Sequence, residues 1–136
     1  MAVINEGIIL NDDKTISFGN YEVTEKLKVK DFEVDGDIYK VRTHNLVTRL
    51  SKNSQLLLET VPGATIHNLS VTEFKTCFEL EGAGDISVTL ELEPETNYSL
   101  YIDDVNLDKV KTNKSGKINF STSVSKSAQQ VKIEKH

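Results

Sequence analysis

The chain has 136 residues, of which 38% are hydrophobic and 27% are charged, and its formal net charge at pH 7 is −5. This length suits one domain with its own core, and the composition excludes both a membrane-spanning protein and an unfolded chain. The negative charge argues against a nucleic-acid-binding protein, which needs a basic surface for phosphates. We therefore expect a single soluble domain over residues 1–136, with no nucleic-acid or membrane partner.

The N-terminal segment and the cysteine content bear on the cellular compartment. The residues after Met1 form neither the basic region nor the apolar stretch of a secretory signal, so a cytoplasmic location is expected. With one cysteine, Cys77, the chain forms no intramolecular disulfide, which suits a reducing compartment. Cys77 lies in the alternating segment 74–80 and is expected to be a small buried side chain rather than a nucleophile.

Hydrophobic residues alternate with polar ones along most of the sequence, and no window of helical length keeps helical spacing. The clearest strand segments are 21–29, 86–92 and 100–102, whose pattern is typical of sheets with one buried face. Turn residues interrupt such segments at short intervals, which predicts roughly eight to eleven strands. The expected fold is an all-β antiparallel β-sandwich, Ig-like or jelly-roll-like, with little or no helix.

Local patterns predict two hairpins and one edge strand. Asp35-Gly36 stands between two alternating segments and predicts a two-residue turn of the primed type. The polar loop 113–116 is expected to join the strands of a second hairpin within residues 105–124. The lysine-rich C-terminal segment 131–135 is expected to be an edge strand, because lysine protects an exposed edge against pairing with other molecules.

Charge is distributed unevenly along the chain. Residues 73–108 contain ten acidic residues and one lysine, for a net charge of −9, whereas residues 109–136 contain seven lysines and one glutamate, for a net charge of +6. Either the two segments lie side by side and offset one another across the sheet, or they make the molecule dipolar and favour self-association. The sequence leaves both interpretations open.

Groups that could form a catalytic or metal site are few. Segment 31–37 resembles the start of a calcium loop, but Arg42 stands where such a loop needs a bidentate glutamate, and a hairpin explains the same residues. His44, His67 and His136 lack ligand spacing, and the common phosphate, dinucleotide and nucleophile motifs are absent. No catalytic residue, metal or cofactor is therefore predicted.

Three residues, Tyr98, Asp103 and Asp104, are the candidates for a binding site. Tyr98 and Tyr101 should point to opposite faces of one strand; Tyr98 is the candidate for an exposed ring, the alternative being a buried tyrosine at a strand corner. Asp103 and Asp104 form, with Asp108, a carboxylate cluster at a strand end. Such a cluster either contacts a ligand or a cation, or forms a polar turn.

The segments 93–104 (EPETNYSLYIDD) and 111–121 (KTNKSGKINFS) resemble a terminal pattern of accessory β-sandwich domains in polysaccharide-active enzymes. Asp104 stands where that pattern has a turn glycine. Together with segments 5–13 and 17–21, nearly the whole chain resembles short clostridial proteins commonly labelled endosialidase. The resemblance implies an accessory-type sandwich and carries over no catalytic residue.

These observations favour a non-catalytic binding module over an enzyme. Its ligand is expected to be a protein partner, a second copy of the chain or a glycan, presented with the loops of residues 97–116. The alternative is a small carbohydrate-active enzyme, a glycosidase or a lyase, that uses surface carboxylates or a tyrosine.

Overall fold

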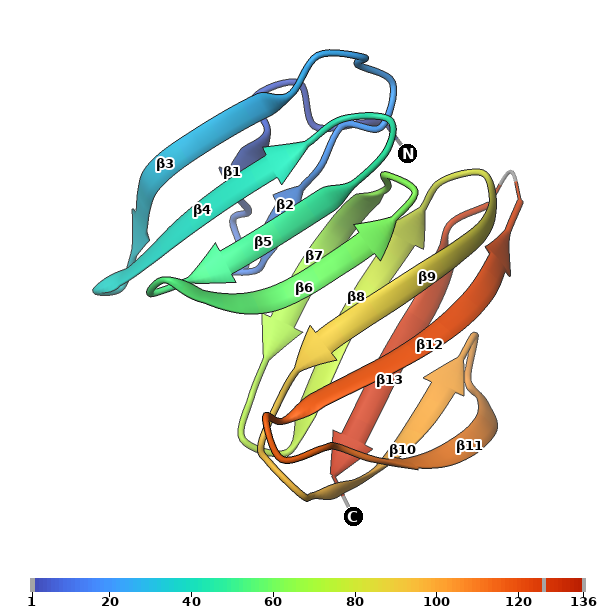
Figure 1. Cartoon of the computed structure of the whole chain (residues 1–136). Coiled ribbons are helices and arrows are strands. Elements are labelled where there is room, and N and C mark those ends of the chain that lie inside the picture. Colours follow the sequence, from blue (N-terminus) through green and yellow to red (C-terminus); the bar gives the residue numbers. More distant parts are fainter. Residues whose placement is uncertain (1, 126, 136) are drawn as a thin grey trace.

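The computed structural model describes residues 2–125 and 127–135, and His136, considered above, lies outside them. Thirteen strands form two antiparallel sheets that pack face to face, and the described residues contain no helix (Figure 1). The all-β sandwich expected from the sequence is thereby confirmed, with more strands than predicted. Among the described residues, no helix is long and apolar enough to cross a membrane.

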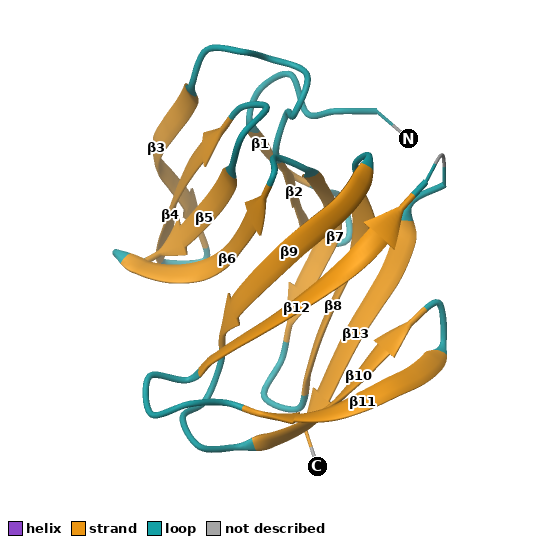
Figure 2. Cartoon of the chain, turned by 45° about the vertical axis from the view of Figure 1, so that its right-hand side comes forward, coloured by secondary structure: helices purple, strands orange, loops and turns teal. Residues whose placement is uncertain are grey.

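Each sheet combines strands from distant parts of the chain. The seven-stranded sheet has the order β1 (Ile8–Leu10), β2 (Ile16–Phe18), β7 (Thr65–Val71), β8 (Lys75–Glu81), β13 (Gln129–Lys135), β10 (Asn97–Ile102) and β11 (Val105–Lys111). The six-stranded sheet has the order β12 (Lys117–Val124), β9 (Gly84–Glu91), β6 (Gln55–Val61), β5 (Thr48–Lys52), β4 (Asp37–Thr43) and β3 (Leu27–Val34). Figure 2 shows the two layers from a second side.

Alternation along the strands builds one hydrophobic core between the sheets. Leu80 of β8 and Ile133 of β13 are fully buried from one sheet, as are Leu50 of β5 and Leu90 of β9 from the other. Neighbouring residues on each strand point to the opposite side, so each sheet also has an outer face with mostly polar side chains. The depressions considered below lie on these two outer faces.

Two-residue turns close some of the hairpins, and longer loops close others, such as residues 44–47 between β4 and β5. At Asp35-Gly36 the φ angles are +50° and +87° and Val34 pairs with Asp37, which confirms the predicted primed turn. Asp103-Asp104 forms a second turn of this kind, with φ angles of +50° and +67°, between β10 and β11. The polar turn given as an alternative for Asp103 and Asp104 is therefore correct. The hairpin itself was not predicted, because the motif lacks the glycine that usually marks such turns, although aspartate tolerates a positive φ.

The hairpin predicted within residues 105–124 is wrong. Strand β11 belongs to the seven-stranded sheet, whereas β12 pairs with β9 in the other sheet. The loop between them is fastened to a second crossing loop: the Thr112 N–H donates to the Thr96 carbonyl at 3.0 Å, and the Leu92 N–H donates to the Gly116 carbonyl at 2.7 Å. Residues 112–116 therefore carry the chain from one sheet to the other.

Three other local predictions need correction. The C-terminal segment is no edge strand, because β13 lies between β8 and β10 and its Val131 and Ile133 are part of the core. The strand predicted to begin at Tyr21 begins at Leu27. Cys77 is half-buried on the outer face rather than buried, because β8 points Thr76 and Phe78 inward.

The acidic and basic segments lie side by side, as the first interpretation of the charge pattern required. Basic β13 lies between β8 and β10, and β12 pairs with β9 along its whole length. Among residues 2–125 and 127–135, one ion pair joins the segments: the Lys135 Nζ lies 2.6 Å from the Glu93 Oε2, and this contact raises the pKa of Lys135. The charges of the two segments therefore offset one another locally.

Candidate functional site

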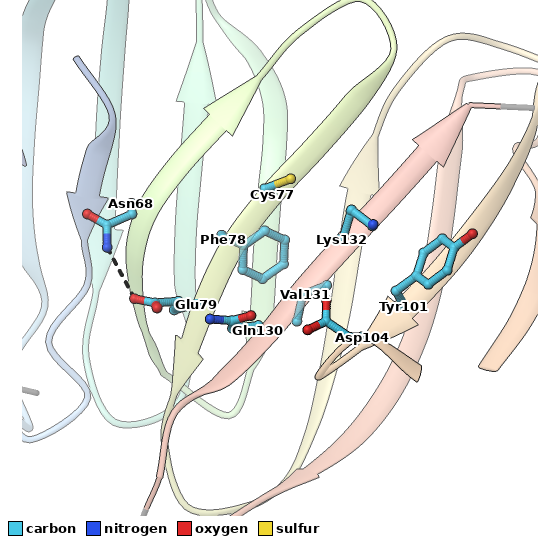
Figure 3. Close-up of a pocket in the computed structure, with 9 residues that line it drawn as sticks. All are labelled: Asn68, Cys77, Phe78, Glu79, Tyr101, Asp104, Gln130, Val131 and Lys132. Atoms are coloured by element: carbon cyan, nitrogen blue, oxygen red, sulfur yellow. Dashed lines mark hydrogen bonds between the residues drawn. The ribbon is translucent and has the colours of Figure 1, made fainter. Parts of the chain in front are cut away.

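The outer face of the seven-stranded sheet holds an open depression of about 250 Å³. Its lining comes from β7, β8, β13, β10 and the turn after β10, and consists of Asn68, Cys77, Phe78, Glu79, Tyr101, Asp104, Gln130, Val131 and Lys132. Strand pairing sets the spacing, since Glu79 lies opposite Gln130 and Cys77 lies opposite Lys132. Figure 3 shows these side chains spread across the strands, with Asn68 at one end and Tyr101 at the other.

An aromatic ring and a cation form one end of the depression. Tyr101 lies opposite Lys132 on the neighbouring strand, and the Lys132 Nζ stands 4.4 Å from the centre of the Tyr101 ring. This distance is that of a cation–π contact, which orders both side chains. The Tyr101 ring and the Lys132 ammonium group therefore present a fixed apolar and positive edge to any ligand.

Amide and carboxylate side chains form the other end. Asn68 adopts a φ of +57° within an irregular pairing of β7 with β8, which places its side chain on the outer face. Its Nδ2 donates to Glu79 Oε2 at 3.1 Å, and its Oδ1 accepts from Asn11 Nδ2 at 3.2 Å. These contacts hold the amide and the carboxylate in one orientation.

A second cluster lies on the same face, beside a depression lined in part by Tyr21 and Glu81. The His67 Nε2 lies 2.8 Å from Glu81 Oε1, and the Tyr21 hydroxyl donates to Glu81 Oε2 at 3.0 Å. His67 is 9% exposed, so this contact is nearly shielded from water. Both oxygens of the Glu81 carboxylate are thus engaged by side chains of the chain itself.

The protonation of Tyr21 decides what this cluster can do chemically. Burial, followed by the hydrogen bond to Glu81, raises the pKa of Tyr21 to about 12. A tyrosine that removes a proton from a substrate needs a pKa shifted toward neutral pH, which is the opposite direction. The Tyr21 hydroxyl therefore stays protonated as a donor to Glu81, and the cluster fastens the segment after β2 to the sheet.

The three candidate binding residues have different positions in the structure. Tyr98 is 5% exposed and its hydroxyl accepts from the Glu93 N–H at 3.2 Å, so the exposed ring predicted there is wrong and the strand-corner alternative is correct. Asp103 belongs to the turn, where its Oδ1 accepts from the Gln130 N–H at 2.9 Å. Asp104 lines the depression and is the one candidate that the structure places in it.

The other residues of the depression were missed as a binding site. Asn68 and Gln130 are far apart in sequence, and only the pairing of β13 between β8 and β10 brings them together. Alternation on β8 and β13 could have indicated that Glu79 and Lys132 face outward. No group of three or more potential metal ligands occurs among residues 2–125 and 127–135.

Comparison with protein-family models, with curated proteins and with solved structures gives no match. The site must therefore be interpreted from its own geometry.

Proposed function

We propose that the chain is a non-catalytic binding module that recognises a glycan on the outer face of its seven-stranded sheet. The observation that carries this proposal is the mixed lining of the depression: amide donors and acceptors from Asn68 and Gln130, carboxylates from Glu79 and Asp104, and the Tyr101 ring. Sugar hydroxyl groups both donate and accept hydrogen bonds, so such a ligand can use every one of these groups.

The charge of the depression favours one class of glycan. Glu79 and Asp104 contribute two carboxylates, whereas Lys132 contributes one ammonium group that is already held over Tyr101. A uronic or sialic acid polymer would meet net repulsion there, so the proposed ligand is a neutral or amino sugar chain. A cytoplasmic location, with Cys77 as a free half-buried thiol, is part of this proposal.

The alternative, a small carbohydrate-active enzyme, has less support. A carboxylate nucleophile or acid needs an oxygen free to reach the substrate, and Glu81, the carboxylate with a histidine beside it, has both oxygens engaged. Tyr21 is held in its neutral form by the raised pKa.

The test is a glycan array that contains neutral, amino and acidic oligosaccharides, followed by calorimetry of the best ligand. We expect neutral or amino sugars to bind, and Gln130→Ala and Asp104→Ala each to weaken binding about tenfold, since one good hydrogen bond contributes about 1.4 kcal/mol. Ser121→Ala, an exposed change on the opposite sheet, is the matched control. Absence of binding, equal effects of all three variants, or release of a cleaved product would overturn the proposal.

Self-association is a second candidate function, favoured by the exposed edge strand β11. Val105 and Leu107 are each 58% exposed on this strand, which has one unpaired side. Light scattering should then give a mass above 15.2 kDa that falls toward this value in Leu107→Lys. A wild-type mass equal to the monomer's at high protein concentration would rule this candidate out.

A further inference from the structure

The outer face of the six-stranded sheet carries basic side chains on three neighbouring strands. Lys28 of β3 lies opposite Arg42 of β4, and Arg42 lies opposite Arg49 of β5. All three point outward, because the residues next to them on β4 and β5, Val41 and Leu50, are fully buried. Figure 1 shows these three strands side by side at one end of the sheet.

This arrangement carries an electrostatic cost. Side chains directly opposite on antiparallel strands have Cβ atoms about 4.5–5.5 Å apart, and like charges at this spacing destabilise the pair. The chain has a net charge of −5, so its carboxylates outnumber its lysines and arginines. Carboxylates could therefore have stood between these cations, and the electrostatic cost is unusual. The row Lys28, Arg42 and Arg49 is therefore a concentration of positive charge that the fold itself does not require.

Arg42 and Arg49 line an open depression of about 180 Å³, together with Lys40 and Ser51. Lys40 lies opposite Ser51 on the neighbouring strand, one outward position along from the pair of Arg42 with Arg49. The four side chains thus form the corners of a quadrilateral on β4 and β5. Every corner offers N–H or O–H donors, and no carboxylate or amide belongs to the lining.

The chain supplies little countercharge to this group. Within residues 2–125 and 127–135, the one ion pair of the row joins Arg49 Nη1 to Glu59 Oε2 at 3.6 Å. The Arg49 side chain is 43% exposed in this pair, and exposed pairs contribute little to stability. Among the residues that the structure describes, Glu59 is therefore the one carboxylate paired with any of the four cations Lys28, Lys40, Arg42 and Arg49.

We propose that this depression, lined by Lys40, Arg42, Arg49 and Ser51, binds a single tetrahedral oxyanion of the sulfate or phosphate type, either free or carried on a glycan. Arginine presents parallel N–H donors that match two oxygens of such a group, and lysine adds a compact charge. The bound oxyanion removes the repulsion between the opposed arginines.

This inference is independent of the glycan-binding proposal, since the two depressions lie on opposite sheets. Failure of either proposal therefore leaves the other unaffected.

The test measures thermal unfolding in sulfate, in phosphate and in chloride at matched ionic strength. Saturating oxyanion should raise the Tm of the wild type by about 5 °C above its value in chloride, because a ligand that binds only the folded state stabilises it. In Arg42→Gln this gain should fall by at least half. Lys109→Gln removes an exposed lysine of β11 and is the matched control. Its Tm should rise in oxyanion as much as that of the wild type.

The variants also separate a site from a general salt effect. Sulfate stabilises most proteins by exclusion from their surface, so equal gains in the wild type, Arg42→Gln and Lys109→Gln would overturn the proposal. At low ionic strength in chloride, Arg42→Gln should unfold at a higher temperature than the wild type, because it relieves the opposed charges. If Arg42→Gln fails to fold, Lys40→Gln, which removes an exposed side chain of the same lining, provides the same comparison.

A further arm distinguishes the source of the oxyanion. Dextran sulfate is added at the same concentration of sulfate groups as the free ion. A larger gain in the wild type with dextran sulfate than with free sulfate, lost in Arg42→Gln, assigns the site to an oxyanion on a glycan. The reverse order assigns it to a free ion, and no gain in either arm overturns the inference.

Discussion

The two outer faces of the sandwich are both polar, but their side chains are organised in opposite ways. On the seven-stranded sheet, opposite or neighbouring groups are chemically complementary, as in Asn68 with Glu79 and His67 with Glu81. On the six-stranded sheet, Arg42 faces other cations on both sides. On the first face, side chains of complementary chemistry stand together, whereas on the second face like charges stand opposite one another. The seven-stranded face is therefore a candidate site because it offers mixed hydrogen-bonding groups, and the six-stranded face because it concentrates positive charge.

The largest expected effect comes from removing the most shielded carboxylate of the seven-stranded face. Glu81→Ala leaves the groups of His67 and Tyr21 without their acceptor, and the free energy of unfolding should fall by about 2 kcal/mol. Urea denaturation measures this change. Glu81→Gln keeps the shape and one acceptor oxygen, so it should cost less; equal losses in both variants would contradict the role given to the charge.

The next effect tests how Asn68 is held. In Asn68→Ala the side chain loses its contacts with Glu79 and Asn11, and alanine must adopt a φ of +57°, so a loss of about 1–2 kcal/mol is expected. Asn68→Gly removes the same contacts without the backbone strain. Chemical denaturation should therefore rank glycine as less destabilising than alanine, and the opposite ranking would show that backbone strain is unimportant there.

A smaller effect is expected on the six-stranded face. Glu59→Gln removes the one carboxylate paired with the basic row, and the loss should be about 0.5 kcal/mol at low ionic strength. The loss should shrink as salt screens the exposed charges. Unfolding curves at low and high potassium chloride check this, and a loss that does not change with salt would mean that Glu59 acts through packing.

The last effect appears only at alkaline pH. The pKa of Tyr21 is raised from 10.0 to about 12 in the folded state, so the unfolded chain loses this proton first as the pH rises. The stability contribution of neutral Tyr21 is therefore fully present below pH 10 and is lost between about pH 10 and 12. Tyr21→Phe should show a shallower decline over this range, and parallel declines would contradict the raised pKa.

Much of the fold could be predicted from the sequence because alternation reports directly on which residues face a core. The sandwich and the Asp35-Gly36 turn followed from this pattern and from turn chemistry. The hairpin assigned to residues 105–124 failed because a polar loop has the same local signature whether it joins two neighbours or crosses between sheets. The prediction for β13 failed because Lys132 and Lys135, on which the edge assignment rested, gave no information about the strands beside it.

The candidate site was predictable only in part. Asp104 could be singled out because two aspartates at a strand end are conspicuous in a sequence. Gln130 and Asn68 could not, since their proximity depends on strand order. The basic depression was missed for the same reason: Arg42 and Arg49 are seven residues apart, and only the β4–β5 register places them opposite each other.

The position of Cys77 offers a practical handle. It is the chain's one cysteine, it is half-buried, and it lies in the lining of the depression on the seven-stranded sheet. A small environment-sensitive fluorophore coupled to its Sγ would therefore lie beside the proposed sugar-binding groups. No residue would have to be substituted to attach it at this one position. A change in emission on titration would report occupancy directly, and the wild-type sequence is already suited to such a biosensor.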